Sequence, residues 1–190
     1  MAISVITPAT AEPLTVSEVK DFLRVDSDAE DTLIGVLISA AREMAEKYTR
    51  RILMSTTIEE FYDIFPTYTI KDSDIIYLSR GPIQSITSVK YVDTVGDEIT
   101  IATDKYNTDL ISEPGRIIST SGWYATKDTV NAVIVRYVVG YSSASDVPAA
   151  IKQAMLLLIG EMYEKRVDSV KRLPTAAEYL MNPYRVFTYY

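Results

Sequence analysis

The chain has 190 residues, of which 47% are hydrophobic and 24% charged, a composition typical of one folded globular protein. It contains no Cys and no His, which excludes thiol nucleophiles, thiolate zinc sites and the usual general base. Its net charge of −7 argues against a surface built to grip nucleic acid, but it allows an acidic surface along which DNA passes. We therefore expect a function carried by surfaces, with no cofactor, no metal and no catalytic residue.

The N-terminal residues 1–8 lack the basic flank and long apolar stretch of a secretory signal. No apolar run approaches the ~18 residues that a membrane span needs. The sequence thus predicts a soluble protein that is neither exported nor inserted into a membrane.

Two helices are predicted near the N-terminus. The first covers residues 13–24, where Thr15 or Ser17 precedes an apolar stripe and Glu18 falls in the first turn. The second covers residues 28–49 and has an apolar stripe wider than contact with one partner demands. Part of that stripe is therefore available to another subunit. The stripe and the residues beside it are Leu33, Ile34, Leu37, Ile38, Ala40, Ala41, Met44, Ala45 and Tyr48.

The middle of the chain, residues 52–141, reads as a β section. Strands are predicted over residues 56–62, 74–78, 83–92, 98–101, 116–118 and 132–139. Short turns without a helical pattern join them, which favours an antiparallel sheet. The strand at 132–139 is apolar on both faces except at Arg136, so it should lie in the middle of a sheet.

The C-terminal part, residues 142–190, is again predicted to be helical. A helix over residues 148–166 has apolar residues around most of its surface, which again suggests a second buried face. A short helix is predicted over 175–181, and a strongly aromatic tail follows. The fold class is therefore α+β: one domain, 1–190, in which N-terminal (1–51) and C-terminal helices (142–190) form a helical bundle, with an intervening antiparallel β section (52–141).

Some candidate sites have a plain structural alternative. The acidic run from Asp26 to Asp31 resembles the start of a calcium loop, but an EF-hand needs Gly at position six and Glu at position twelve, where this chain has Asp31 and Leu37. Helix capping explains the run better. A basic cluster of Lys165, Arg166, Lys171 and Arg172 fits compensation of the helix dipole better than DNA binding. Trp123 is a core plug or an interface anchor.

Taken in order, several segments resemble the head-tail connector proteins of long-tailed bacteriophages. They are LTVSEVKDFLRVD at 14–26, the helix at 30–43, GPIQSITSVKYVD at 81–93, YVVGY at 137–141, VPAAIKQA at 147–154 and YEKR at 163–166. The resemblance covers nearly the whole chain and lies in the succession of the segments. The loop around Trp123 and the tail after Pro183 depart most from the family pattern.

The resemblance implies a structural virion protein at the head-tail junction, assembled in the host cytoplasm. Such a subunit forms a ring, commonly of twelve copies, that extends the DNA channel beneath the portal protein and receives the tail or its stopper protein. DNA would pass through without sequence-specific binding. No catalytic residue belongs to that role.

A ring needs two unlike lateral surfaces on each subunit, and the wide apolar faces of the long helices would supply them. We therefore expect Ile38, Tyr48, Leu156 and Leu157 at the subunit interface. The aromatic tail either folds back onto its own domain or contacts the portal, and the residues for that contact are Tyr184, Arg185, Phe187, Tyr189 and Tyr190.

Two other functions stay open from sequence. One is another virion structural protein, such as a tail-end or minor capsid subunit. The other is a carboxylate- or metal-dependent hydrolase, which would require three or more acids to meet in one cleft. The candidate acids are Asp26, Asp28, Glu30, Asp31, Asp109 and Glu113.

Overall fold

The computed structural model describes residues 2–65, 75–165 and 174–187. The chain forms two compact units. The β unit comprises Met1–Pro8, Ser55–Gly140 and Phe187–Tyr190, and the helical unit comprises Ala9–Met54 and Tyr141–Val186. The chain therefore passes from the β unit into the helical unit, returns to complete the sheets, and enters the helical unit again.

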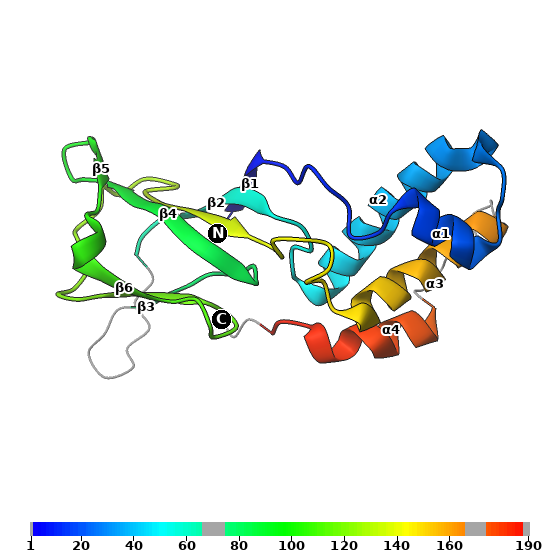
Figure 1. Ribbon diagram of the computed structural model, residues 1–190. Coiled ribbons are helices and arrows are strands. Elements are labelled where there is room, and N and C mark those ends of the chain that lie inside the picture. Colours follow the sequence, from blue (N-terminus) through cyan, green and yellow to red (C-terminus); the bar gives the residue numbers. More distant parts are fainter. Residues whose placement is uncertain (1, 66–74, 166–173, 188–190) are drawn as a thin grey trace. The chain divides into compact units, whose positions relative to one another are not determined.

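The larger sheet of the β unit has five antiparallel strands in the order β1-β2-β8-β4-β5 (Figure 1). The strands are β1 (Ala2–Thr7), β2 (Thr56–Tyr62), β4 (Ile83–Val92), β5 (Glu98–Thr100) and β8 (Val133–Val139). Buried and half-buried residues alternate along β2 and β8, as expected when one face of a sheet covers a core. The prediction that 132–139 lies mid-sheet is confirmed.

A second, three-stranded antiparallel sheet has the order β3-β7-β6. Its strands are β3 (Ile75–Tyr77), β6 (Tyr106–Asp109) and β7 (Arg116–Ser119), and the turn η2 (Thr103–Lys105) precedes β6. A hydrogen bond of 3.0 Å from the Tyr62 hydroxyl to the Tyr77 carbonyl joins β2 of the larger sheet to β3 of the smaller one. Ile58, Ile76 and Ile117 are almost fully buried and form part of the core of this unit.

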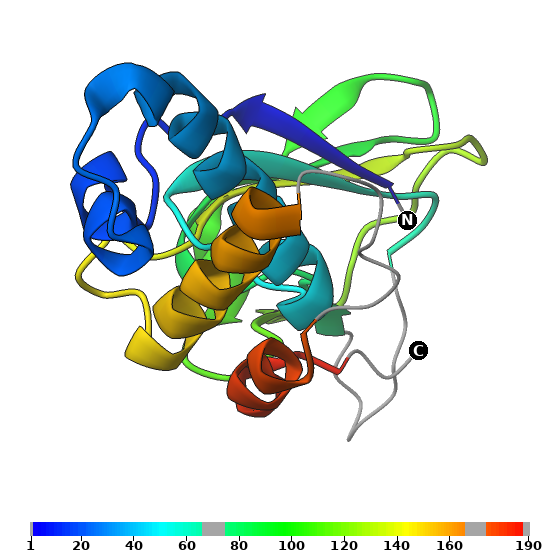
Figure 2. The same ribbon diagram turned by 90° about the vertical axis from the view of Figure 1, so that its right-hand side faces the viewer.

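The helical unit packs four helices (Figures 1 and 2). They are α1 (Val16–Leu23), α2 (Asp31–Thr49), α3 (Ala149–Lys165) and α4 (Thr175–Met181), with the short turns η1 (Asp28–Glu30) and η3 (Asn182–Tyr184). α3 contacts the other three helices. Its buried residues Ile151, Met155 and Leu158 meet Ile34 and Ile38 of α2 in one continuous apolar core. Burial of this core is the main stabilising contribution in the unit.

The start of α1 follows from its sequence. The Thr15 hydroxyl accepts a hydrogen bond of 3.2 Å from the Glu18 amide, and the Glu18 carboxylate accepts one of 2.7 Å from the Thr15 amide. This reciprocal capping box satisfies two backbone donors at the helix end. The Glu18 carboxylate accepts hydrogen bonds from the Thr15 amide and from the Thr15 hydroxyl (2.9 Å), and these two bonds lower the pKa of Glu18. Of the two caps considered from sequence, Thr15 is therefore the one used.

The predicted α+β class is confirmed. The strands predicted over 83–92 and 98–101 correspond closely to β4 and β5, which form the predicted hairpin. The prediction of one antiparallel β section was incomplete, because the strands form two sheets and two of them, β1 and β6, were not predicted. β1 has all six residues exposed, so it lacks the alternation that marks a half-buried strand. β6 is mostly polar, so it also gives no signal of a half-buried strand. None of the described helices is both long and apolar enough to cross a bilayer.

Candidate assembly surfaces

The C-terminal segment, residues 182–187, is hydrogen-bonded to the end of α2 and to the residues that follow it. The Val186 amide donates a hydrogen bond of 2.9 Å to the Thr49 carbonyl. Nε of Arg51, a residue only 8% exposed, donates one of 2.6 Å to the Tyr184 carbonyl. The left-handed residue Arg50 (φ 58°) ends α2 and turns the chain at this point. The tail up to Val186 therefore folds back onto its own helical unit.

The predicted portal-contact residues fall into three groups. Tyr184 is half-buried against the helical core, and the Arg185 guanidinium lies 5.4 Å from the ring centroid of Tyr48, which is cation–π distance. Phe187 is 59% exposed. Tyr189 and Tyr190 lie outside the described residues. Among the aromatic residues of the predicted contact that the structure describes, Phe187 is therefore the exposed one.

The predicted subunit-interface residues lie on the helical core. Ile38 is 2% exposed and is enclosed by its own unit, whereas Tyr48, Leu156 and Leu157 are half-buried at the edge of that core. Tyr48 is also tied to the C-terminal segment, since its hydroxyl donates a hydrogen bond of 3.3 Å to Asn182. The apolar side chain that α2 leaves most exposed is Val36, at 62%. Val36 was not among the residues of the predicted apolar stripe.

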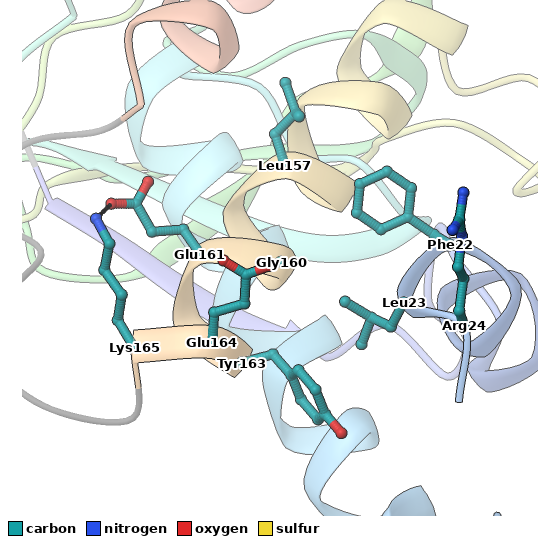
Figure 3. Close-up of a pocket in the computed structure, with 9 residues that line it drawn as sticks. All are labelled: Phe22, Leu23, Arg24, Leu157, Gly160, Glu161, Tyr163, Glu164 and Lys165. Atoms are coloured by element: carbon teal, nitrogen blue, oxygen red, sulfur yellow. Dashed lines mark hydrogen bonds and ion pairs between the residues drawn. The ribbon is translucent and has the colours of Figure 1, made fainter. Parts of the chain in front are cut away.

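A groove of about 570 Å³ lies between the end of α1 and the last turns of α3 (Figure 3). Phe22 and Leu23 of α1 form one wall and Leu157 contributes to the other. Gly160 lets α1 approach α3 closely, because a Cβ at that position would lie 3.3 Å from the Phe22 ring. The charged side chains at the rim are Arg24, Glu161, Glu164 and Lys165.

The acidic run before α2 is held by a lysine. The Lys20 ammonium binds Asp28 and also lies 3.0 Å from Asp31, and these two hydrogen bonds raise the pKa of Lys20. The hydrogen bond from Lys20 lowers the pKa of Asp28. Glu30 accepts a hydrogen bond from the Tyr163 hydroxyl. These acids thus join α1, α2 and α3, which accounts for their positions better than metal binding does.

Asp109 fixes the turn between β6 and β7. Its carboxylate accepts hydrogen bonds from the Ser112 hydroxyl (2.7 Å), the Ser112 amide (3.0 Å) and Nε of Arg116 (2.9 Å). The hydrogen bonds from Ser112, and then that from Arg116, hold the pKa of Asp109 well below its usual range. Across the described residues, no three acidic side chains are grouped to hold a metal ion.

Of the predicted basic cluster, only Lys165 lies among the described residues. Its ammonium lies 2.6 Å from the Glu161 carboxylate one turn earlier, so it forms a local helix pair. Arg166, Lys171 and Arg172 lie outside the described residues.

Trp123 belongs to a set of stacked aromatic rings in the β unit. Its ring stacks on Phe65 with centroids 4.7 Å apart, and Phe65 contacts Tyr91 at 5.9 Å. Tyr91 in turn stacks on Tyr124 at 5.1 Å. Phe65 and Tyr91 are buried and Trp123 is half-buried, so these contacts support the core-plug reading of Trp123.

Whole-chain comparisons give the same fold in known particles. The chain of "Neck of empty GTA particle computed with C6 symmetry" superposes with a TM-score of 0.79 at 24% identity, and 100% of this chain and 98% of that chain are covered. The coverage is the same for a chain of "Virion of native gene transfer agent (GTA) particle" (TM-score 0.76, 22% identity) and one of "Neck of native GTA particle computed with C12 symmetry" (0.74, 24%). At these identities the likeness establishes the fold.

No curated protein sequence matches the chain. The family profile described as "Phage gp6-like head-tail connector protein" matches residues 13–112, which is more than half of the 190 residues. The matched part runs from the capping box of α1 through the β4–β5 hairpin to the turn that Asp109 fixes. The protein therefore belongs to the phage gp6-like head-tail connector family, as the resemblance in its sequence indicated, and is a structural protein rather than an enzyme.

Proposed function

We propose that the chain is the subunit of a closed ring between the portal and the tail, where it extends the DNA channel and provides the site at which the tail or its stopper protein attaches. The observation that carries the proposal is the family match combined with a fold shared over the full chain with neck proteins. Twelve copies is the expected ring size, and necks that contain a similar chain were computed with C12 and with C6 symmetry.

The two units give a ring subunit unlike surfaces to present. A closed ring requires a heterologous contact, in which one patch meets a different patch on the next copy. On the helical unit, Leu33 and Val36 of α2 are 40% and 62% exposed, and Phe22 at the groove is 39% exposed. These positions support a lateral contact through the helices, together with Tyr48, Leu156 and Leu157 at the edge of the core. Ile38, which is buried in the helical core, would then support the contact without touching the next copy.

The charge of the chain fits DNA that passes without sticking. The net charge is −7, and an acidic channel wall repels phosphates instead of releasing counterions. We propose that the DNA contacts are therefore transient and independent of base sequence.

The proposal is tested by mixing the purified chain with the portal protein of the same particle. We expect native mass spectrometry to detect a closed ring bound to portal, and negative-stain electron micrographs to place that ring at the portal's tail side. A chain that stays monomeric with portal present would overturn the proposed function. Rings that bind a tail-end protein but not portal would move the subunit to another place in the particle.

The C-terminal end is the proposed portal contact. Tyr184 and Arg185 are engaged by their own unit, so the contact would begin at the exposed Phe187 and include Tyr189 and Tyr190. Removing residues 187–190 should abolish co-sedimentation with portal while leaving ring formation intact. Replacing the exposed Tyr179 on α4 with Ala is the matched control, since it removes another exposed aromatic side chain, 74% exposed, without shortening the chain. Unchanged portal binding by the shortened chain would exclude this contact.

A further inference from the structure

The edge of the larger sheet at β1 is unguarded. β1 pairs only with β2 among the described strands, so the hydrogen-bonding groups along its other side face outward. All six of its residues are exposed, and Ile3, Val5 and Ile6 are 37%, 57% and 42% exposed. No residue from 1 to 11 is charged. Monomeric proteins usually protect such an edge with charges, prolines or a covering segment, because it is a template for another strand.

The opposite edge of the same sheet is formed by β5, and its only described partner strand is β4. All three of its residues are exposed. Its one charged side chain, Glu98, is already neutralised by Lys90 at 2.7 Å. The two edges of the sheet thus both present backbone without an unpaired charge, although the chain as a whole carries a net charge of −7. Two copies that repel each other elsewhere can approach at these edges without burying a charge.

The side-chain patterns of the two edges match face by face. Ile3 and Val5 pair with the buried Glu60 and Ile58, and Ile99 pairs with the buried Tyr91. Paired residues of neighbouring strands point to the same face. Ile3, Val5 and Ile99 therefore belong to the core-side face of the sheet, whereas the paired residues of the other face are small or polar. Those residues are Ala2 and Ser4 on β1 and Glu98 and Thr100 on β5.

The strand directions are also compatible. Every pairing from β1 to β5 is antiparallel, so after four steps β1 and β5 run in the same direction. Two copies related by rotation about an axis along the strands would bring β5 of one beside β1 of the next in parallel. Because β1 and β5 are different strands, this contact is heterologous and can close a ring.

We propose that the β1 edge of each subunit pairs in parallel with the β5 edge of a second copy of this chain, so that the five-stranded sheets join around the ring. The proposal rests on the proposed function, since it names one of the contacts by which that ring closes. In the assembled ring, Ile99 of one copy lies beside Ile3 or Val5 of the next. Ile99 and its neighbour both become buried.

Cross-linking tests the pairing directly, because the chain has no native Cys to react. Ser4→Cys is combined with Glu98→Cys or with Thr100→Cys, which covers two registers of the short β5 strand, and rings are oxidised with oxidised glutathione. At least one pair should yield a ladder of covalent multimers on a non-reducing gel. Ser4→Cys alone should give no species beyond a dimer. Ser4→Cys with Thr32→Cys, which lies on the helical unit, is the control for random cross-linking.

Assembly provides the second measurement. Val5→Lys places a charge in the junction and should raise the concentration at half-assembly by at least about tenfold. Val95→Lys, in the β4–β5 turn at a position 77% exposed, should leave it within about twofold. Both variants should keep the wild-type far-UV circular dichroism and melting temperature, because Val5 is more than half exposed in the subunit.

The outcomes separate the two proposals. Wild-type chain that forms no ring with portal overturns the proposed function and this contact with it. Wild-type rings, with no ladder from either cysteine pair and with Val5→Lys assembling as well as Val95→Lys, overturn the edge pairing alone. A ladder together with impaired assembly of Val5→Lys supports it.

Discussion

The hydroxyl of Tyr137 donates a hydrogen bond of 2.7 Å to Oε2 of Glu60, and both residues are fully buried in the β unit. The Ser79 amide donates to the same oxygen at 3.2 Å. Burial, and then the Glu60 carboxylate, raise the pKa of Tyr137 well above its usual value. Tyr137 therefore remains a neutral donor across the physiological range, and it provides one of the few hydrogen bonds that satisfy this buried acid.

Replacing Tyr137 with Phe should lower the free energy of unfolding of the β unit by about 1–3 kcal/mol, since it leaves a buried acceptor without its side-chain donor. Urea unfolding followed by the fluorescence of Trp123, which stacks on Phe65 in the same unit, measures the change. Tyr124→Phe is the control, because its hydroxyl is on a residue 43% exposed. Equal stability of the two variants would contradict a stabilising role for the Tyr137 hydrogen bond.

Asp109 should make the β unit sensitive to acid. Its pKa is lower in the folded chain than in the unfolded one, so the unfolded state binds more protons as the solution is acidified. The stabilisation is complete above the unfolded pKa of about 3.9 and is lost as the pH falls through the folded value. Asp109→Asn should remove this part of the pH dependence and reduce stability at neutral pH.

Acid titration with Trp123 fluorescence, comparing Asp109→Asn with wild type, checks this prediction. Asp104→Asn is the matched control, because the Asp104 side chain is 70% exposed and lies 3.4 Å from one lysine. The prediction is wrong if wild type and Asp109→Asn lose stability in parallel below about pH 4.

Arg51→Ala should release the C-terminal segment from α2. It removes the hydrogen bond of 2.6 Å to the Tyr184 carbonyl, so amide exchange at Val186 should accelerate by about tenfold or more. Hydrogen–deuterium exchange with peptide-level readout over residues 182–187 measures the effect. Lys47→Ala, which alters an exposed cation in the last turn of α2, should leave that exchange unchanged. Equal protection in both variants would show that Arg51 does not hold the segment.

Two helical glycines should respond differently to alanine. A Cβ on Gly35 of α2 would meet nothing within 4 Å, so Gly35→Ala should stabilise the helical unit by about 0.5–1 kcal/mol through helix propensity. A Cβ on Gly160 would lie 3.3 Å from Phe22, so Gly160→Ala should gain less. Urea unfolding followed by far-UV circular dichroism compares the two. A larger gain at Gly160 would mean that the Phe22 ring yields without cost.

Local patterns predicted the elements that carry their own signals. The capping box at Thr15 and Glu18 marks the start of α1, and the Gly81-Pro82 break before a stretch rich in β-branched residues marks β4 (Ile83–Val92). The centre of the sheet was predictable because Val133 to Val139 is apolar on both faces. β1 and β6 were missed, because β1 is exposed along its whole length and β6 is mostly polar. Their positions follow from pairing partners far away in the chain, such as Ile3 with Glu60.

The surfaces were harder to predict for the same reason. Periodicity placed Ile38 on the apolar side of α2 but could not tell that α3 covers it fully, while Val36 remains exposed. The fastening of the tail depends on Arg51 meeting Tyr184, two residues that sequence spacing does not connect. The sequence shows a basic residue, Arg51, shortly after an apolar helix, and it shows an aromatic terminus. It does not show that Arg51 donates a hydrogen bond to that terminus.

The divided helical unit has a consequence for synthesis on the ribosome. α1 and α2 emerge first, but the partner that covers them, α3, comes after the entire stretch Ser55–Gly140. At about 5–20 residues per second, the nascent chain carries the apolar faces of Ile34 and Ile38 uncovered for on the order of ten seconds. The β sheets can form before α3 is complete, because their last strand, β8, is translated ahead of α3. The order of the elements along the chain thus makes the helical half the last to fold and the half that most needs protection by chaperones before it can assemble.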